Sequence, residues 1–165
     1  MEKIRFEEIK EVYIDEILRI YTYYVLNTVS TFHICPPTRA EMKNLVFFAN
    51  PKYKTFVIFA NDIICGYVLI TQHKKREAYD TTGEVTIYLD PDFKGKGIGS
   101  LALKYIEDYA VSQEFHGLVA SICGQNTASI KLFEKNGYHK CAHYREIGKK
   151  FGQWLDIVAY QKIVK

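Results

Sequence analysis

The segment Glu84-Val85-Thr86-Ile87-Tyr88-Leu89-Asp90-Pro91-Asp92-Phe93-Lys94-Gly95-Lys96-Gly97-Ile98-Gly99-Ser100 decides how this chain folds. Its β-branched and aromatic residues from Val85 to Leu89 predict a short strand. Pro91 cannot donate a hydrogen bond to a neighbouring strand, so the strand should end before it. Glycine then occupies the alternate positions 95, 97 and 99. The segment therefore predicts a strand that passes into a glycine-rich loop.

An amphipathic helix is expected directly after this loop. Apolar side chains recur there at helical spacing, namely Ile98, Leu101, Ala102, Tyr105, Ile106, Tyr109 and Ala110. The glycines thus lie at the helix N-terminus, where N–H groups are unpaired and the helix dipole is positive. A phosphate or pyrophosphate suits this place, and Lys94 and Lys96 add positive charge. A flexible turn that binds nothing would carry the same glycines.

Three kinds of nucleotide site place a glycine-rich loop between a strand and a helix. A P-loop needs four residues between its first Gly and a Gly-Lys-Ser/Thr string, which does not occur here. Residues 97–102 match the dinucleotide pattern G-x-G-x-x-A, but the next predicted strand, Leu118 to Ile122, ends without an acidic residue for a ribose. The third pattern is Arg/Gln-x-x-Gly-x-Gly/Ala. With Lys94 at its first position, residues 94–99 resemble the acyl-CoA pyrophosphate loop of the GNAT superfamily of N-acetyltransferases.

Length and composition limit the class of protein. The chain has 165 residues, which suits a single domain spanning 1–165. Its net charge of +3 is too slight and too scattered for a nucleic-acid surface. The four cysteines lie far apart without zinc-site spacing, so we expect no metal site and reduced thiols in a cytoplasmic protein. Met1 leads into charged residues and no apolar run approaches ~18 residues, so neither a signal peptide nor a membrane span is expected.

The remaining elements follow from periodicity and capping residues. Strands are predicted at Ile4–Phe6, Thr55–Ala60, Ile63–Thr71, Leu118–Ile122, Tyr138–Ile147 and Trp154–Ile163, with Gly148 and Gly152 in the last loop. Helices are predicted over Ile14–Asn27, from the capping box Thr38–Glu41 to Asn50–Pro51, and from Asn126 to Lys135. This order predicts an α/β domain with a mixed, mostly antiparallel sheet of about seven strands flanked by about four helices. The order also resembles the GNAT fold.

A second motif lies at the last helix. Residues 126–138, Asn-Thr-Ala-Ser-Ile-Lys-Leu-Phe-Glu-Lys-Asn-Gly-Tyr, are similar to the superfamily segment N-x-x-A/S-x-x-L-Y/F/H-E-K-x-G-F/Y, in which the Asn and the following helix meet the CoA. Alone, Asn126 would be read as a helix N-cap. Phe133 stands where many members have a Tyr that protonates the departing thiolate, so a different acid, a water or unassisted release must be considered. The resemblance implies acetyl-CoA as cosubstrate, with binding residues Tyr88, Leu89, Lys94, Gly95, Lys96, Gly97, Ile98, Gly99, Ser100, Asn126, Ser129 and Phe133.

One branch of the superfamily is similar nearly end to end, the phosphinothricin and methionine-sulfone N-acetyltransferases. The similarity covers residues 24–32, the run from Gly66 to Leu89, and the tail from Phe151 to Val158. Departures are His73 for Phe, Lys74 for Arg, Gln153 for Arg and Ala159 for Trp. This resemblance implies a homodimer and a small amino-acid acceptor whose side chain carries a tetrahedral oxo group. The implied substrate residues are Thr28, Ser30, Phe32, His73, Lys74 and Arg76.

The chemistry of N-acetylation asks for a base. An ammonium has no lone pair, so a proton must leave it directly or through water before the nitrogen attacks. Glu84 matches the Glu that the branch uses for this step, whereas alone it would be a solvated carboxylate at a strand end. The branch resemblance assigns the oxyanion donors to backbone N–H groups near Tyr88 and Leu89. The five histidines show no spacing typical of a base or ligand, so we expect packing or surface roles for all but His73.

Two other classes of function fit the same loop. An enzyme that acetylates a protein N-terminus or lysine would share the cofactor loop but present an open, acidic groove. A non-catalytic acyl-CoA-binding domain would keep residues 94–99 without needing Glu84. Turnover of acetyl-CoA with a panel of amines separates these alternatives.

Overall fold

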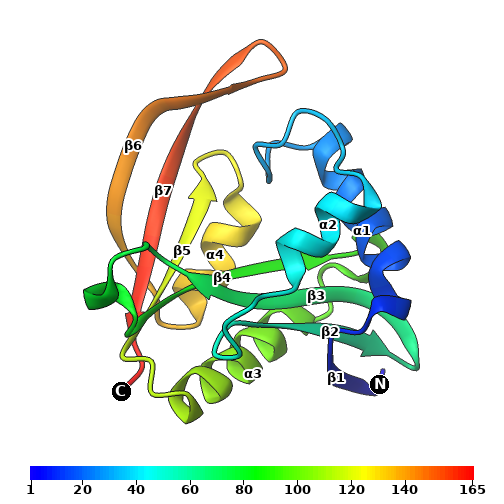
Figure 1. The fold of residues 1–165 in the computed structure, drawn as a ribbon. Helices are drawn as coiled ribbons and strands as arrows, with labels where there is room; N and C mark the ends of the chain where they lie inside the picture. The colour runs from blue at the N-terminus through cyan, green and yellow to red at the C-terminus, as the bar shows by residue number, and fades with distance from the viewer.

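The computed structural model describes residues 1–165 and contains one sheet of seven strands in the order β1-β2-β3-β4-β5-β7-β6 (Figure 1). Only β4 and β5 are parallel, and every other neighbouring pair is antiparallel. The mixed, mostly antiparallel sheet expected from the sequence is therefore confirmed. The strands are β1 (Ile4–Glu8), β2 (Lys54–Ala60), β3 (Ile63–Gln72), β4 (Thr82–Leu89), β5 (Gly117–Cys123), β6 (His139–Lys150) and β7 (Gln153–Ile163).

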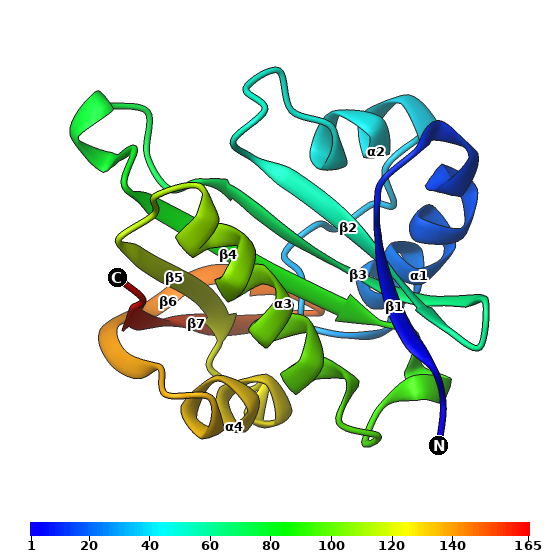
Figure 2. The same ribbon diagram turned by 90° about the horizontal axis from the view of Figure 1, so that it is seen from below.

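Two helices cover each face of the sheet (Figures 1 and 2). The helices are α1 (Ile14–Asn27), α2 (Arg39–Val46), α3 (Ile98–Ser112) and α4 (Thr127–Lys135). Strands β2 and β3 are buried on both faces, and alternate residues enter opposite cores. Val57 and Tyr67 pack with α1 and α2, whereas Ile58 and Val68 pack with α3 and α4. None of these helices combines the length and the apolar character that crossing a bilayer would require.

The two halves of the sheet are joined by a short parallel contact. Strand β4 pairs with β5 only through Thr82↔Gly117, Gly83↔Leu118 and Glu84↔Val119. Both strands continue past this point, β4 to Leu89 and β5 to Cys123. Because their pairing ends at Glu84, the two strands separate beyond it and leave one edge of each without a strand partner.

Two details differ from the sequence expectations. Helix α2 ends at Val46 rather than near Asn50, because Phe47 is extended and Phe48 turns its ring toward Tyr53 at the edge of the core. Gly148 lies within β6 opposite Leu155 and not in a loop, so the hairpin turn contains only Phe151 and Gly152. Strand β6 has more residues than the part of β7 with which it pairs. The extra residues lie at two register shifts, one between Lys140 and Ala142 and one between Tyr144 and Gly148.

The reason for glycine at position 148 is a close approach. A β-carbon there would lie 2.4 Å from the ring of Phe32, which therefore occupies the space that a side chain would need. Elsewhere, Asn61 and Asp62 both have positive φ in the turn between β2 and β3, as the predicted tight hairpin requires. All four cysteines are unpaired, with Cys65 and Cys123 buried and Cys35 and Cys141 exposed.

Substitution of Gly66 tests how closely β3 packs against the end of β4. Gly66 lies opposite Leu89, and a β-carbon at this position would come 2.4 Å from the carbonyl oxygen of Tyr88. Gly66→Ala should therefore lower the free energy of unfolding by about 1–3 kcal/mol, because the backbone of β4 must shift. Urea denaturation followed by circular dichroism measures this difference.

Gly117→Ala is the matched control. Gly117 also lies in a strand, but the nearest atom to its added β-carbon is 3.5 Å away, an ordinary contact. We expect its stability to stay within about 0.5 kcal/mol of the parent, as for a substitution without a clash. Equal stability of the two variants would show that the backbone of β4 can shift at Tyr88 without lowering the free energy of unfolding.

Candidate active site

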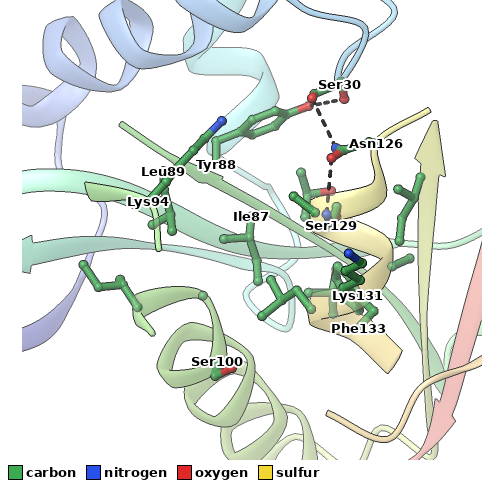
Figure 3. A pocket seen from close by; sticks show the side chains of 18 of the residues that line it. Ser30, Ile87, Tyr88, Leu89, Lys94, Ser100, Asn126, Ser129, Lys131 and Phe133 are labelled. Carbon is green, nitrogen blue, oxygen red and sulfur yellow. Dashed lines mark hydrogen bonds between the residues drawn. The ribbon is translucent and has the colours of Figure 1, made fainter. Parts of the chain in front are cut away.

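A cavity of about 490 Å³ occupies the gap between β4 and β5 (Figure 3). Val85 to Leu89 of β4 form one wall and Ala120 to Ile122 of β5 form the other. Residues at the start of α3 and along α4 complete the lining. The cavity is thus a direct consequence of the separation of the two strands beyond Glu84 and Val119.

The glycine-rich loop forms an open cradle at this cavity. Gly95 and Gly97 have φ of +75° and +80°, conformations that favour glycine, and no atom lies within 4 Å of a β-carbon at either position. Gly97 is the N-cap of α3 and supplies no side-chain cap. The first backbone bond of the helix runs from Leu101 N–H to the carbonyl of Gly97, so three earlier N–H groups remain unpaired. These donors suit an anion.

The starts of α2 and α4 are capped by side chains. Thr38 and Glu41 form the predicted capping box at α2, and Asn126 accepts a hydrogen bond from Ser129 N–H at α4. The predicted caps at these two helices are therefore confirmed. Helix α3 differs from these two because its N-terminus has no side-chain cap and borders the cavity.

Three lysines line the cavity. Lys94 lies at the start of the loop with its ammonium 4.9 Å from the ring of Tyr24, and Lys131 projects from α4 (Figure 3). Lys135, one turn further along α4, also lines the cavity. Lys96 does not line the cavity, because it pairs with Glu2 at 3.0 Å. Sequence reasoning missed Lys131 and Lys135, although their i,i+4 spacing on a predicted helix could have placed them on one face.

Two tyrosines join the cavity wall to its surroundings. Tyr24 donates a hydrogen bond to the carbonyl of Leu89, and Tyr88 donates one to the carbonyl of Ser30 at 3.4 Å. Burial raises the pKa of both phenols well above the usual range, so both stay neutral at ordinary pH. Tyr24 lies within the segment singled out in the sequence, but its position on the wall could not be read from spacing.

Strand β4 itself offers polar groups to the cavity. In an antiparallel pair, every second residue directs its N–H and C=O away from the neighbouring strand. Since β4 pairs with β3 along its whole length but with β5 only as far as Glu84, half of these groups between Val85 and Leu89 face the gap. Tyr24 satisfies one of them, the carbonyl of Leu89. The others are available to a ligand or water.

Asn126 has two bonds that connect the cavity to the loop between α1 and α2. Its carbonyl oxygen accepts from Ser129 N–H at 3.2 Å, and its amide nitrogen donates to the hydroxyl of Ser30 at 3.1 Å (Figure 3). Ser129 and Phe133 also line the cavity, and the Phe133 ring packs against Tyr138 with 4.9 Å between centroids. Phe133 offers no proton to this wall.

Glu84 lies where the paired part of β4 ends. By strand alternation its side chain shares a face with Tyr88, on the side of α1 and α2. Its side chain is 28% exposed, and its Oε2 lies 3.2 Å from Nδ1 of His73. His73 therefore contacts the carboxylate, unlike the other four histidines. Glu84 does not line the cavity and sits beyond its end.

The predicted substrate residues fall into three groups. Ser30 lines the main cavity, and Thr28 lines a smaller neighbouring hollow. Phe32 packs on Gly148, while the buried Lys150 donates to the carbonyl of Thr31 at 2.8 Å and so holds this loop against β6. Burial lowers the pKa of Lys150. Lys74 and Arg76 are exposed on the connection between β3 and β4 and do not line the cavity.

Comparison with known proteins assigns the family. The model of the acetyltransferase (GNAT) family matches residues 17–138. The chain belongs to the GNAT acetyltransferase family. This N-acetyltransferase is 31% identical over 148 residues to phosphinothricin N-acetyltransferase of Streptomyces coelicolor, covering 87% of this chain and 86% of that protein. It is 29% identical to the L-methionine sulfoximine/L-methionine sulfone acetyltransferase of Salmonella typhimurium, covering 88% and 85% of the two chains.

A solved relative of this GNAT enzyme contains acetyl-CoA. The phosphinothricin acetyltransferase of Sinorhizobium meliloti, in complex with that compound, superposes with a TM-score of 0.91 at 28% identity, covering 97% of this chain and 88% of the other. The GNAT fold expected from the order of elements is thereby confirmed. The bare cradle of N–H groups, the lysines and the unpaired edge of β4 suit an anionic, amide-bearing ligand of this kind.

Gly97 and Gly152 allow a controlled test of the cradle. Both have positive φ, +80° and +71°, and open space where a β-carbon would be added, but only Gly97 lines the cavity. Gly97→Val should bind acetyl-CoA at least tenfold more weakly, because the branched side chain blocks approach to the N–H groups. Gly152→Val carries the same backbone strain and should keep its affinity. Isothermal titration calorimetry measures both, and equal affinities would remove the cradle from the binding site.

Proposed function

We propose that this enzyme transfers an acetyl group from acetyl-CoA to the α-amino group of a small amino acid of the phosphinothricin, methionine sulfone or methionine sulfoximine type. The observation that carries the proposal is the placement of Glu84 and the N–H cradle at opposite ends of the unpaired part of β4. Leu89 lies five residues after Glu84, a distance of roughly 17 Å along an extended strand. A long cosubstrate, with its anionic end at the cradle and its acyl end directed along β4 toward Glu84, suits this arrangement.

The residues that line the cavity fall into two groups along β4, one for each part of the cosubstrate. Gly95, Gly97 and the first N–H groups of α3 would receive the pyrophosphate, with Lys94, Lys131 and Lys135 as counter-charges. Asn126 and the free groups of β4 would bind the amide-bearing arm. Bound there, the cosubstrate supplies an acyl group activated as a thioester.

The transfer step needs a base and an oxyanion donor. Glu84 removes the proton from the attacking amine through water, and the electron pair of the amine then forms the bond to the carbonyl carbon. The N–H groups of β4 that face the gap near Tyr88 and Leu89 receive the negative charge on the carbonyl oxygen, an interaction worth ~3 kcal/mol in comparable sites. Phe133 cannot protonate the thiolate, which leaves this role to a water or to the bulk solvent.

The acceptor is proposed to lie beside Glu84 on the α1 and α2 side of β4. Loop residues Thr28, Ser30 and Phe32 follow α1 on that side, where Ser30 is held by Asn126 and Tyr88. Lys74 and Arg76 follow His73, which touches Glu84, so they stand at the same edge of the sheet. Their charges suit the carboxylate and the oxo group of the acceptor. The names of the relatives from Streptomyces coelicolor and Salmonella typhimurium support this class of substrate.

A homodimer acting in the cytoplasm is part of the proposal. The hairpin of β6 and β7 leaves several large apolar side chains exposed, namely Tyr144, Ile147, Phe151 and Trp154. Such a patch favours contact with another protein surface, here a second copy. The four unpaired cysteines suit a reducing compartment.

Glu84→Gln tests the base. The amide keeps the size and the hydrogen-bonding capacity of the carboxylate but cannot take a proton, so kcat should fall by ~10²–10⁴ at neutral pH. The deficit should shrink as pH rises, since more of the amine is then already neutral. Acetyl-CoA affinity, measured by calorimetry, should not change. Full turnover by this variant would place the base elsewhere.

Lys74 tests the acceptor assignment. Lysine cannot reproduce the bidentate fork of the Arg usual at this position, so we expect methionine sulfone or sulfoximine to be acetylated at least as well as phosphinothricin. Lys74→Ala should raise KM for the acceptor more than it lowers kcat. Lys75→Ala, the exposed neighbour outside the pattern, is the control and should leave both constants unchanged. Turnover of polyamines, aminoglycosides or peptide N-termini alone would contradict the substrate class.

A further inference from the structure

We propose that His73 is a positioning residue that fixes the direction of the Glu84 carboxylate through a hydrogen bond. This inference rests on the proposed role of Glu84 as the base. The contact that carries it joins His73 Nδ1 to Glu84 Oε2 at 3.2 Å. It is the only side-chain hydrogen bond of Glu84, so Oε1 remains free to receive the proton of the amine.

Strand geometry brings the two side chains together. Thr71 of β3 pairs with Glu84 of β4, and His73 follows two residues later on the same face. Such diagonal neighbours lie within reach of long side chains. The imidazole also meets the ring of Tyr79 edge-on, with 5.9 Å between centroids. Its side chain is 23% exposed, so the ring is restrained by its contacts but still reaches solvent.

The direction of the hydrogen bond follows from the partners. An ionised carboxylate only accepts, so the neutral imidazole donates through Nδ1–H and keeps its lone pair on Nε2. The bond holds Oε2 and thereby sets the direction in which Oε1 points. A phenylalanine, usual at this position in the branch that the sequence resembles, has no such donor. This chain therefore orients its proposed base by a hydrogen bond that the branch pattern lacks.

Kinetics of two variants test the positioning role. His73→Asn keeps an amide donor near the place of Nδ1, whereas His73→Phe removes the donor. The Asn variant should keep kcat with methionine sulfone within about threefold of wild type, because its donor can still hold Oε2. The Phe variant should lose about tenfold in kcat, with unchanged affinity for acetyl-CoA.

A second readout needs no turnover. Nitrogen NMR of the imidazoles, with the His73 signals assigned by their loss in His73→Asn, should show the Nδ1–H tautomer at neutral pH. Glu84→Gln should shift the Nδ1 signal. His116→Asn is the control, because His116 is exposed and its ring makes no hydrogen bond. It should change neither kcat nor the His73 signals.

The outcomes are distinct. An Nε2–H tautomer, a wild-type kcat in His73→Phe, or an equal loss of kcat in His73→Asn and His73→Phe would each overturn the role of His73. If Glu84→Gln is inactive while the His73 variants behave as wild type, the inference fails and the proposed function stands. If Glu84→Gln remains active, the proposed base itself is wrong, whatever the tautomer of His73.

Discussion

The separation of β4 from β5 after Glu84 and Val119 is the constraint on which the rest of the structure depends. A buried N–H or C=O without a partner costs about 1–3 kcal/mol, so two strands that part inside a protein need other partners for their edges. Along β4 the only such partner within the chain is the Tyr24 hydroxyl at the carbonyl of Leu89. The remaining groups line a cavity open to solvent, where water or a ligand can meet them. The free-energy cost of separating the two strands is therefore low only while water or a ligand occupies the cavity between them.

Contacts across the gap replace the missing strand pairing. The loop between α1 and α2 is bound from both sides: Tyr88 on β4 holds the carbonyl of Ser30, and Asn126 before α4 holds its hydroxyl. Further along, the buried Lys150 of β6 holds the carbonyl of Thr31. The segment that we propose to border the acceptor is therefore also the segment that ties the two halves of the sheet together. A change that loosens this loop should affect acceptor binding before it affects the cosubstrate cradle, which belongs to α3 alone.

Features set by local chemistry were predictable from the sequence. The capping box at Thr38, the cap at Asn126, the tight turn at Asn61 and the glycine loop each depend on a few adjacent residues, and each is found as expected. Features that depend on which face of a helix or strand packs against the rest of the protein were not predictable. Lys96 pairs with Glu2 and Lys131 reaches the cavity because of tertiary packing, which no spacing reveals. Gly148 was expected in a loop because the sequence does not show that Phe32 fills its missing side chain.

The absence of a tyrosine at position 133 makes the transfer depend more on a base, for which we propose Glu84. Tyr24 and Tyr88 each commit their single proton to a carbonyl, and burial keeps the pKa of both phenols high, so neither is placed as a ready acid. A thiolate can nevertheless leave without one: with a thiol pKa near 8.5, the ionised form at pH 7 lies only about 2 kcal/mol above the protonated form. The amine has no comparable alternative, because its ammonium form cannot attack at all. An enzyme with Phe133 can therefore dispense with the acid but not with the base, and Glu84 is the carboxylate whose direction this chain fixes with a hydrogen bond.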